Sequence, residues 1–164
     1  QNWLPLHVLS SGYGYAGKTY ECAYYNDPVE YRTRLQYWAQ YFDAAVATGT
    51  LSHHSRDGHY LTDNPSDIST RAYQFKYFLS VVFLLPCLFF NSKGFFYTKG
   101  VCLREIRNED TLSPETLDFL DECSSIRKCW LEDDGRLKTQ LDANFVPSMF
   151  RNALRMTREL IEGL

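Results

Sequence analysis

One segment of the chain has residue types and spacing that match a known catalytic motif. The residues Gly12-Tyr-Gly-Tyr-Ala-Gly-Lys-Thr19 satisfy the phosphate-loop pattern G-x-x-x-x-G-K-[ST]. In such a loop the main-chain N–H groups surround a phosphate, the lysine reaches the terminal phosphate oxygens, and the hydroxyl binds Mg²⁺. The candidate phosphate-binding residues are therefore Gly12, Gly17, Lys18 and Thr19.

The sequence around this motif argues against a nucleotide site. An Asp27-Pro28 break follows within about nine residues, whereas a phosphate loop must open a helix. Tyr13 and Tyr15 are bulky for a phosphate cradle. No series of β-branched strands alternates with helices, so the supporting parallel sheet is not indicated. We predict an aromatic, glycine-rich loop and keep nucleotide binding as an alternative.

Two further sets of side chains could bind a metal ion. His53, His54 and His59 lie near Asp57, but Asp57-Gly58 is typical of a turn and nothing fixes a ligand geometry. The cysteines are odd in number and none forms a C-x-x-C pair; they are Cys22, Cys87, Cys102, Cys123 and Cys129. We predict a solvated loop for the histidines, free or buried thiols for the cysteines, and no metal or other cofactor.

The overall composition narrows the classes of function. The chain has 164 residues with a formal net charge of −3, which argues against nucleic-acid binding because such proteins present a strongly basic surface. Aromatic residues make up 16% of the chain and are favoured at interfaces and at membrane boundaries. No catalytic constellation is indicated. We therefore expect a protein that is not an enzyme, has no small-molecule substrate and packs against other protein subunits.

The central apolar run, residues 65–97, is the segment around which the rest of the chain is organised. Its residues are apolar on all faces between Val81 and Phe90, so they require burial in lipid or in protein. The fourteen residues Tyr77 to Phe90 favour a core helix, but extension to Tyr97 gives twenty-one residues bracketed by aromatic side chains, as in a membrane span. The predicted lipid- or partner-packing residues are Tyr77, Phe78, Val81, Phe83, Leu84, Leu85, Leu88, Phe89 and Phe90.

The segments on either side are more polar. Residues 1–26 read as irregular, with no signal peptide indicated, and residues 50–64 as a polar connector. Residues 27–49 predict an amphipathic helix that begins after Asp27 and ends at Gly49. Residues 98–164 predict a helical C-terminal region with starts at Ser113-Pro114 and near Pro147. Its last helix carries a basic ridge, which consists of Arg151, Arg155 and Arg158.

These patterns predict a mainly α fold of four to five helices, with the central helix as a single transmembrane span. The alternative is a soluble helical bundle. The corresponding functional hypothesis is a non-catalytic accessory subunit of a multi-protein membrane complex in contact with lipid. By analogy of type, respiratory-chain subunits of the mitochondrial inner membrane fit such a chain. The alternatives are a soluble intracellular all-α interaction domain and a nucleotide-binding protein that uses Gly12 to Thr19.

Overall fold

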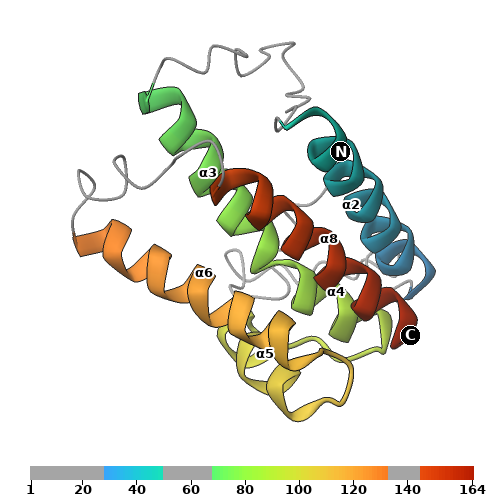
Figure 1. Ribbon diagram of the computed structural model, residues 1–164. Helices are drawn as coiled ribbons and strands as arrows, with labels where there is room; N and C mark the ends of the chain where they lie inside the picture. The colour runs from blue at the N-terminus through green and yellow to red at the C-terminus, as the bar shows by residue number, and fades with distance from the viewer. Residues whose placement is uncertain (1–27, 50–67, 133–144) are drawn as a thin grey trace, which may run out of the picture.

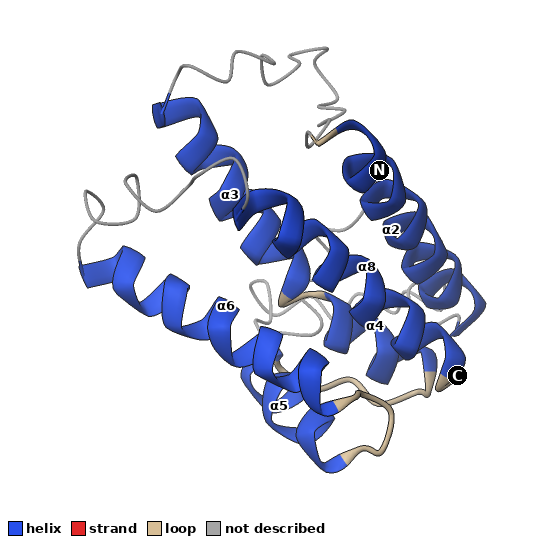
Figure 2. Cartoon of the chain, in the orientation of Figure 1, coloured by secondary structure: helices blue, strands red, loops and turns tan. Residues whose placement is uncertain are grey.

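The described part of the chain is built from helices. The computed structural model describes residues 28–49, 68–132 and 145–164, and no strand occurs within these ranges (Figures 1 and 2). The predicted mainly α fold is therefore confirmed. The helices are α2 (Pro28–Thr48), α3 (Ile68–Val82), α4 (Leu85–Ser92), α5 (Lys99–Glu105), the 3₁₀ helix η2 (Ile106–Asn108), α6 (Pro114–Glu132) and α8 (Phe145–Glu162).

Helix α2 is the amphipathic helix that the sequence predicts. It ends where Gly49 adopts a φ of 71°, a left-handed conformation that glycine reaches without strain. The Gly49 N–H donates to the Ala45 carbonyl at 2.8 Å and closes the last turn. The buried side chains of α2 recur at helical spacing and form one stripe, which consists of Tyr31, Leu35, Phe42 and Ala45.

The central apolar run forms two helices, so the prediction of one uninterrupted helix to Tyr97 is wrong. Pro86 lacks an N–H and its ring would clash with the carbonyl four residues earlier, which belongs to Val82. Helix α3 ends at that residue, Phe83 and Leu84 form a turn, and α4 begins at Leu85. The Leu84 N–H instead donates to the Val81 carbonyl at 2.8 Å, three residues back.

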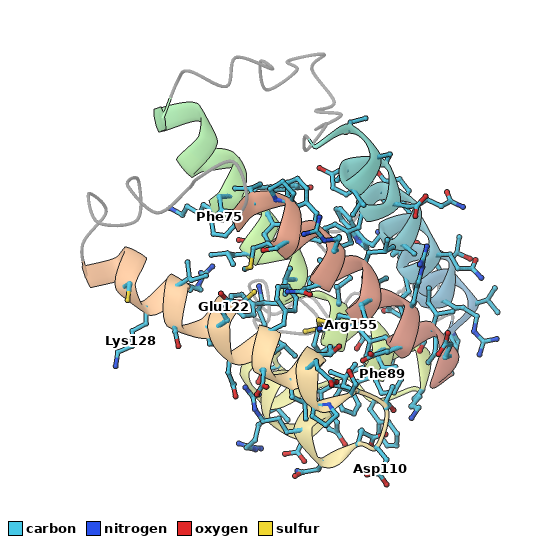
Figure 3. All side chains as sticks on the ribbon, viewed as in Figure 1. Phe75, Phe89, Asp110, Glu122, Lys128 and Arg155 are labelled. Carbon is cyan, nitrogen blue, oxygen red and sulfur yellow. The ribbon has the colours of Figure 1, made fainter. Side chains whose placement is uncertain are left out.

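The apolar faces of α3 and α4 are covered by the other helices of the chain. Helix α4 packs against α2, α5 and α8, while α3 packs against α6. Phe78 joins three of these elements, because its ring centroid lies 5.8 Å from that of Phe42 on α2 and 5.5 Å from that of Phe150 on α8. In Figure 3, Phe75 and Phe89 lie among the core side chains, whereas Lys128 on α6 points outward. The run is thus buried by protein.

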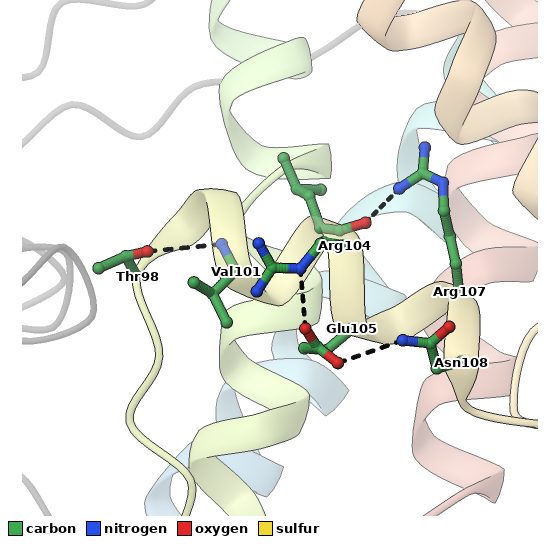
Figure 4. A network of polar contacts seen from close by, with 7 residues as sticks. Thr98, Val101, Arg104, Glu105, Arg107 and Asn108 are labelled. Atoms are coloured by element: carbon green, nitrogen blue, oxygen red, sulfur yellow. Dashed lines mark hydrogen bonds and ion pairs between the residues drawn. The ribbon is translucent and has the colours of Figure 1, made fainter.

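A network of polar contacts stabilises α5 and η2, the short helices that follow the central run (Figure 4). The Thr98 hydroxyl accepts from the Val101 N–H at 3.4 Å and caps the start of α5. Glu105 accepts from Arg104 and from Asn108 at 2.9 and 3.2 Å. Arg107 donates to the Leu103 carbonyl and to Asp121, so η2 is bonded to α6. The Thr98 cap fixes the far end of the loop between α4 and α5, and the other contacts hold α5 and η2 in place.

The start of α6 is held by a side chain of α8. The Ser113 N–H and hydroxyl both donate to the Glu159 carboxylate, at 3.0 and 2.8 Å. The Ser113 oxygen in turn accepts from the Thr116 N–H at 3.3 Å, so Ser113 caps α6 as the sequence predicts. The Arg155 Nε donates to the buried Thr116 hydroxyl at 3.1 Å. This arrangement joins the start of α6 to α8 through residues that are forty-six positions apart in the sequence.

Candidate functional site

The candidate site is the loop of residues 93–98, between α4 and α5, which carries two exposed aromatic side chains. Phe95 and Phe96 are 50% and 42% exposed, whereas the phenylalanines of α2, α3, α4 and α6 whose burial is described are buried. We call these two residues the aromatic surface. Large apolar side chains that lie exposed next to one another mark interaction sites more often than single exposed residues do.

The main chain of this loop is fixed by the end of α4. Gly94 has a φ of 83°, and its N–H donates to the Asn91 carbonyl at 3.0 Å. The Phe95 N–H donates to the Phe90 carbonyl at 2.8 Å. These are the two hydrogen bonds of a Schellman motif, which stops a helix and turns the chain away from it. The aromatic surface therefore projects from a defined backbone conformation.

The buried amide of Asn91 and the rings of Phe90 and Tyr97 pack against the inner side of the loop. The Asn91 side chain is 1% exposed, and its amide group lies 3.2 and 3.1 Å from the carbonyl oxygens of Cys87 and Phe95, to which its nitrogen is assigned because only the nitrogen can donate. The Tyr97 ring packs against Phe90 with centroids 5.4 Å apart and stacks on Phe95 at 5.8 Å. The backbone and one face of Phe95 are thus held in place, while half of the side chain stays open to solvent.

The aromatic surface continues toward the start of α2. The Phe96 ring meets the Tyr31 ring edge-on at 6.3 Å, and Val29, two residues before Tyr31, is 68% exposed. The cation of the loop is neutralised, because Lys93 forms an ion pair with Glu109 at 3.1 Å and lies 4.3 Å above the Phe89 ring. The surface is therefore apolar and close to neutral in charge.

The predicted packing residues of the central run point into the chain itself. Tyr77 is half-buried and the other eight are buried, among them Phe83, Leu85 and Phe89 at 3% exposure or less. The stretch Phe75–Ser92 is long and apolar enough to cross a membrane by length and composition, but 78% of it is buried within the protein. Because a core helix passes the same test, this is weak support for a span.

The basic ridge of α8 lies along a groove of about 480 Å³. Its floor contains Val46 and Leu154, and all three predicted arginines line it together with Glu159 and Glu162. Two of the arginines are already bonded within the chain: Arg158 pairs with Asp43 of α2 at 3.1 Å, and Arg155 donates to Thr116. The Asp43, Glu159 and Glu162 carboxylates offset part of the positive charge of the ridge, whereas the hydrogen bond to Thr116 leaves the charge of Arg155 unchanged.

Other candidate residues fall partly outside the described ranges. The motif Gly12 to Thr19 and the histidines His53, His54 and His59 lie there, so both remain predictions. Within the described residues no three metal-ligating side chains come together. The cysteines in these ranges are free thiols; Cys87, Cys102 and Cys123 are buried and Cys129 is exposed. Burial raises the pKa of the Cys123 thiol.

Sequence reasoning treated Phe95 and Phe96 as the end of a long helix and so missed them as a surface site. The sequence offers a turn at Asn91, Ser92 and Gly94 as the alternative to the long helix, and a glycine after the last apolar turn is typical of a helix end. No family model, curated protein or solved structure matches this chain. The functional argument therefore depends on the geometry of the described residues.

Proposed function

We propose that this chain is a non-catalytic helical interaction module that binds another protein through the aromatic surface. The observation that carries the proposal is the exposure of Phe95 and Phe96 on a backbone fixed by hydrogen bonds. Aromatic side chains are enriched at protein interfaces, where one or two of them supply most of the binding energy.

The rigidity of the loop favours this role. A side chain that is already held in one position loses little conformational entropy on binding, so more of its apolar burial appears as affinity. Phe95 is held by its main-chain bond to Phe90 and by stacking on Tyr97. Phe96 is held by its contact with Tyr31. Both rings can enter an apolar pocket of a partner without rearrangement of the loop.

The charges around the loop favour a protein partner over a lipid surface. Interfacial binding to anionic lipid depends on basic side chains that flank the apolar residues. Lys93, the cation within the loop, is paired with Glu109. The complementary surface is therefore an uncharged apolar pocket, which proteins provide.

Site-specific photo-crosslinking tests this proposal. A photoreactive phenylalanine analogue at Phe95 or Phe96 of the full chain, in cells that express it, should give an adduct with one discrete protein. The matched control places the analogue at Asp118, an exposed position on α6, where the same adduct should not form. With the purified partner, the Phe95→Ser/Phe96→Ser variant should bind at least about tenfold more weakly. Adducts with lipid alone, or unchanged affinity of the double variant, would refute the proposal.

A membrane-anchored accessory subunit remains the second candidate. The observation in its favour is the length and composition of Phe75–Ser92. In that arrangement α2 and α8 would have to leave the central helices so that lipid could replace them. A membrane complex of the respiratory-chain type is the corresponding, more specific proposal. It is supported by analogy of type and by the aromatic content of the chain.

A further inference from the structure

Charged side chains of opposite sign are separated along the groove on α8. The helix lies between α2 and α6 (Figure 1). Among the residues that line the groove, Arg151 and Arg155 come first along the helix, and Glu159 and Glu162 come last. The groove therefore has a positive end and a negative end, about 16 Å apart along the helix axis, because each helical residue advances the chain by about 1.5 Å.

The charges at the two ends have no counter-ion within the described part of the chain. Arg151 and Glu162 are exposed, and neither forms an ion pair there. Arg158 precedes Glu162 by one helical turn, but it pairs with Asp43 of α2 instead, at 3.1 Å. A ligand that matches this groove must therefore supply a negative charge at one end and a positive charge at the other.

A second copy of the chain meets this requirement by symmetry. When two α8 helices lie antiparallel about a twofold axis, the order of charges along one helix is the reverse of the order along the other. The register that places Arg151 opposite Glu162 of the second copy also brings Arg155 within one residue of the position opposite its Glu159. Because the interface is symmetric, each of these pairs occurs twice.

We propose that the groove on α8 is a homodimer interface in which Arg151 of each copy pairs with Glu162 of the other. In this register Leu154 lies within one turn of the axis, so the apolar floors that Leu154 and Val46 form in the two grooves face each other. Arg158 lies next to the axis, where its ion pair with α2 already offsets its charge.

Partners of a single charge sign fit this groove less well. An acidic peptide or an anionic lipid surface would match the arginines at one end, but it would place like charge against the glutamates at the other end. A copy of α8 avoids this repulsion. The interface contains neither Phe95 nor Phe96, so the inference does not depend on the proposed function.

Sedimentation velocity of the full chain at low ionic strength tests the interface. Association through one helix face is weak, so the average mass should rise from that of one chain at about 1 µM towards that of two chains at about 200 µM. Salt at about 0.5 M should lower the dimer fraction, because it screens exposed ion pairs. At about 1 µM the chain is monomeric, and substitution of Glu162 should leave its unfolding unchanged.

Charge reversal identifies the residues that face each other. Arg151→Glu and Glu162→Arg should each weaken dimerisation at least about tenfold, because each places two pairs of like charges in contact. The double variant should regain dimerisation, and so should an equimolar mixture of the two single variants, since opposite charges face each other again in both. Two controls should leave the dimer unchanged: Lys128→Glu, a charge reversal on the exposed face of α6, and Phe95→Ser/Phe96→Ser.

Three results would overturn the proposal. The first is a chain that stays monomeric at every concentration. The second is a dimer that Arg151→Glu leaves unchanged, including one that only Phe95→Ser/Phe96→Ser disrupts, since the aromatic surface would then be the interface. The third is a double variant and a mixture of single variants that both stay monomeric, because the two charges would then not face each other.

Discussion

At the scale of single residues, Tyr41 is a buried polar group without a partner. Its hydroxyl makes no hydrogen bond within the described residues, while its ring packs against Trp38 and Phe42. A buried hydroxyl that gives up its hydrogen bonds to water destabilises the folded state. The same burial, together with neighbouring Tyr77 and Tyr37, raises the pKa of Tyr41 far above the ordinary value of 10.0.

We expect Tyr41→Phe to raise the free energy of unfolding by about 1 kcal/mol at neutral pH, because it removes this cost and keeps the ring. Above pH 10.0 the unfolded tyrosine ionises while the folded one stays protonated, so the native state binds more protons and stability falls as pH rises. The variant should lose less stability over that range. Denaturant unfolding at neutral pH and above pH 10.0 measures this, with Tyr97→Phe as the control because Tyr97 does not act on Tyr41; equal pH slopes for the wild-type protein and Tyr41→Phe would contradict it.

At the scale of elements, a carboxylate of α8 holds the start of α6. Glu159 of α8 accepts both the N–H and the hydroxyl of Ser113, which caps α6. The two residues are forty-six positions apart in the sequence. A local capping pattern predicts the role of Ser113, but it contains no information about Glu159. The packing of α8 against α6 determines that Glu159 is the partner of Ser113.

We expect Ser113→Ala to cost about 1 kcal/mol of unfolding free energy and Glu159→Ala about 1 to 2 kcal/mol, because each leaves partly buried donors or acceptors unpaired. The double variant should cost less than their sum, with a coupling energy of about 0.5 to 2 kcal/mol. Thermal or denaturant unfolding of the four proteins measures it. Exposed Glu162→Ala serves as the control and should change stability by less than about 0.5 kcal/mol. Additive losses would show that the carboxylate does not act on the cap.

At the scale of the whole molecule, the surroundings of the central run separate the two functional candidates. In the folded chain α2, α5, α6 and α8 cover α3 and α4, so the apolar faces need no lipid. We expect the protein to be released into the supernatant on alkaline carbonate extraction of the cells that express it. Retention with the membrane pellet would contradict this result and favour the anchored candidate. A known bitopic membrane protein in the same extract controls for complete extraction.

The sequence by itself determined the helical character of the chain and many of its helix ends. Gly49, Pro86 and Ser113 act through local sterics and hydrogen bonds, which involve neighbours within about five residues. The absence of a polar face between Val81 and Phe90 also required that the run be buried. The same local rule predicts that Pro86 kinks or ends a helix that is buried in protein, whereas a membrane span would tolerate it.

Only the tertiary structure decided what buries the run and which side chains remain outside. Helix α2 and helix α8 come from opposite ends of the described chain, and their packing on α4 results from the long-range fit of apolar faces. The exposure of Phe95 and the burial of Cys87 and Cys102 follow from that fit. Hydrophobic burial is non-directional. The sequence therefore shows that these residues must be buried, but it does not show which side chains they pack against.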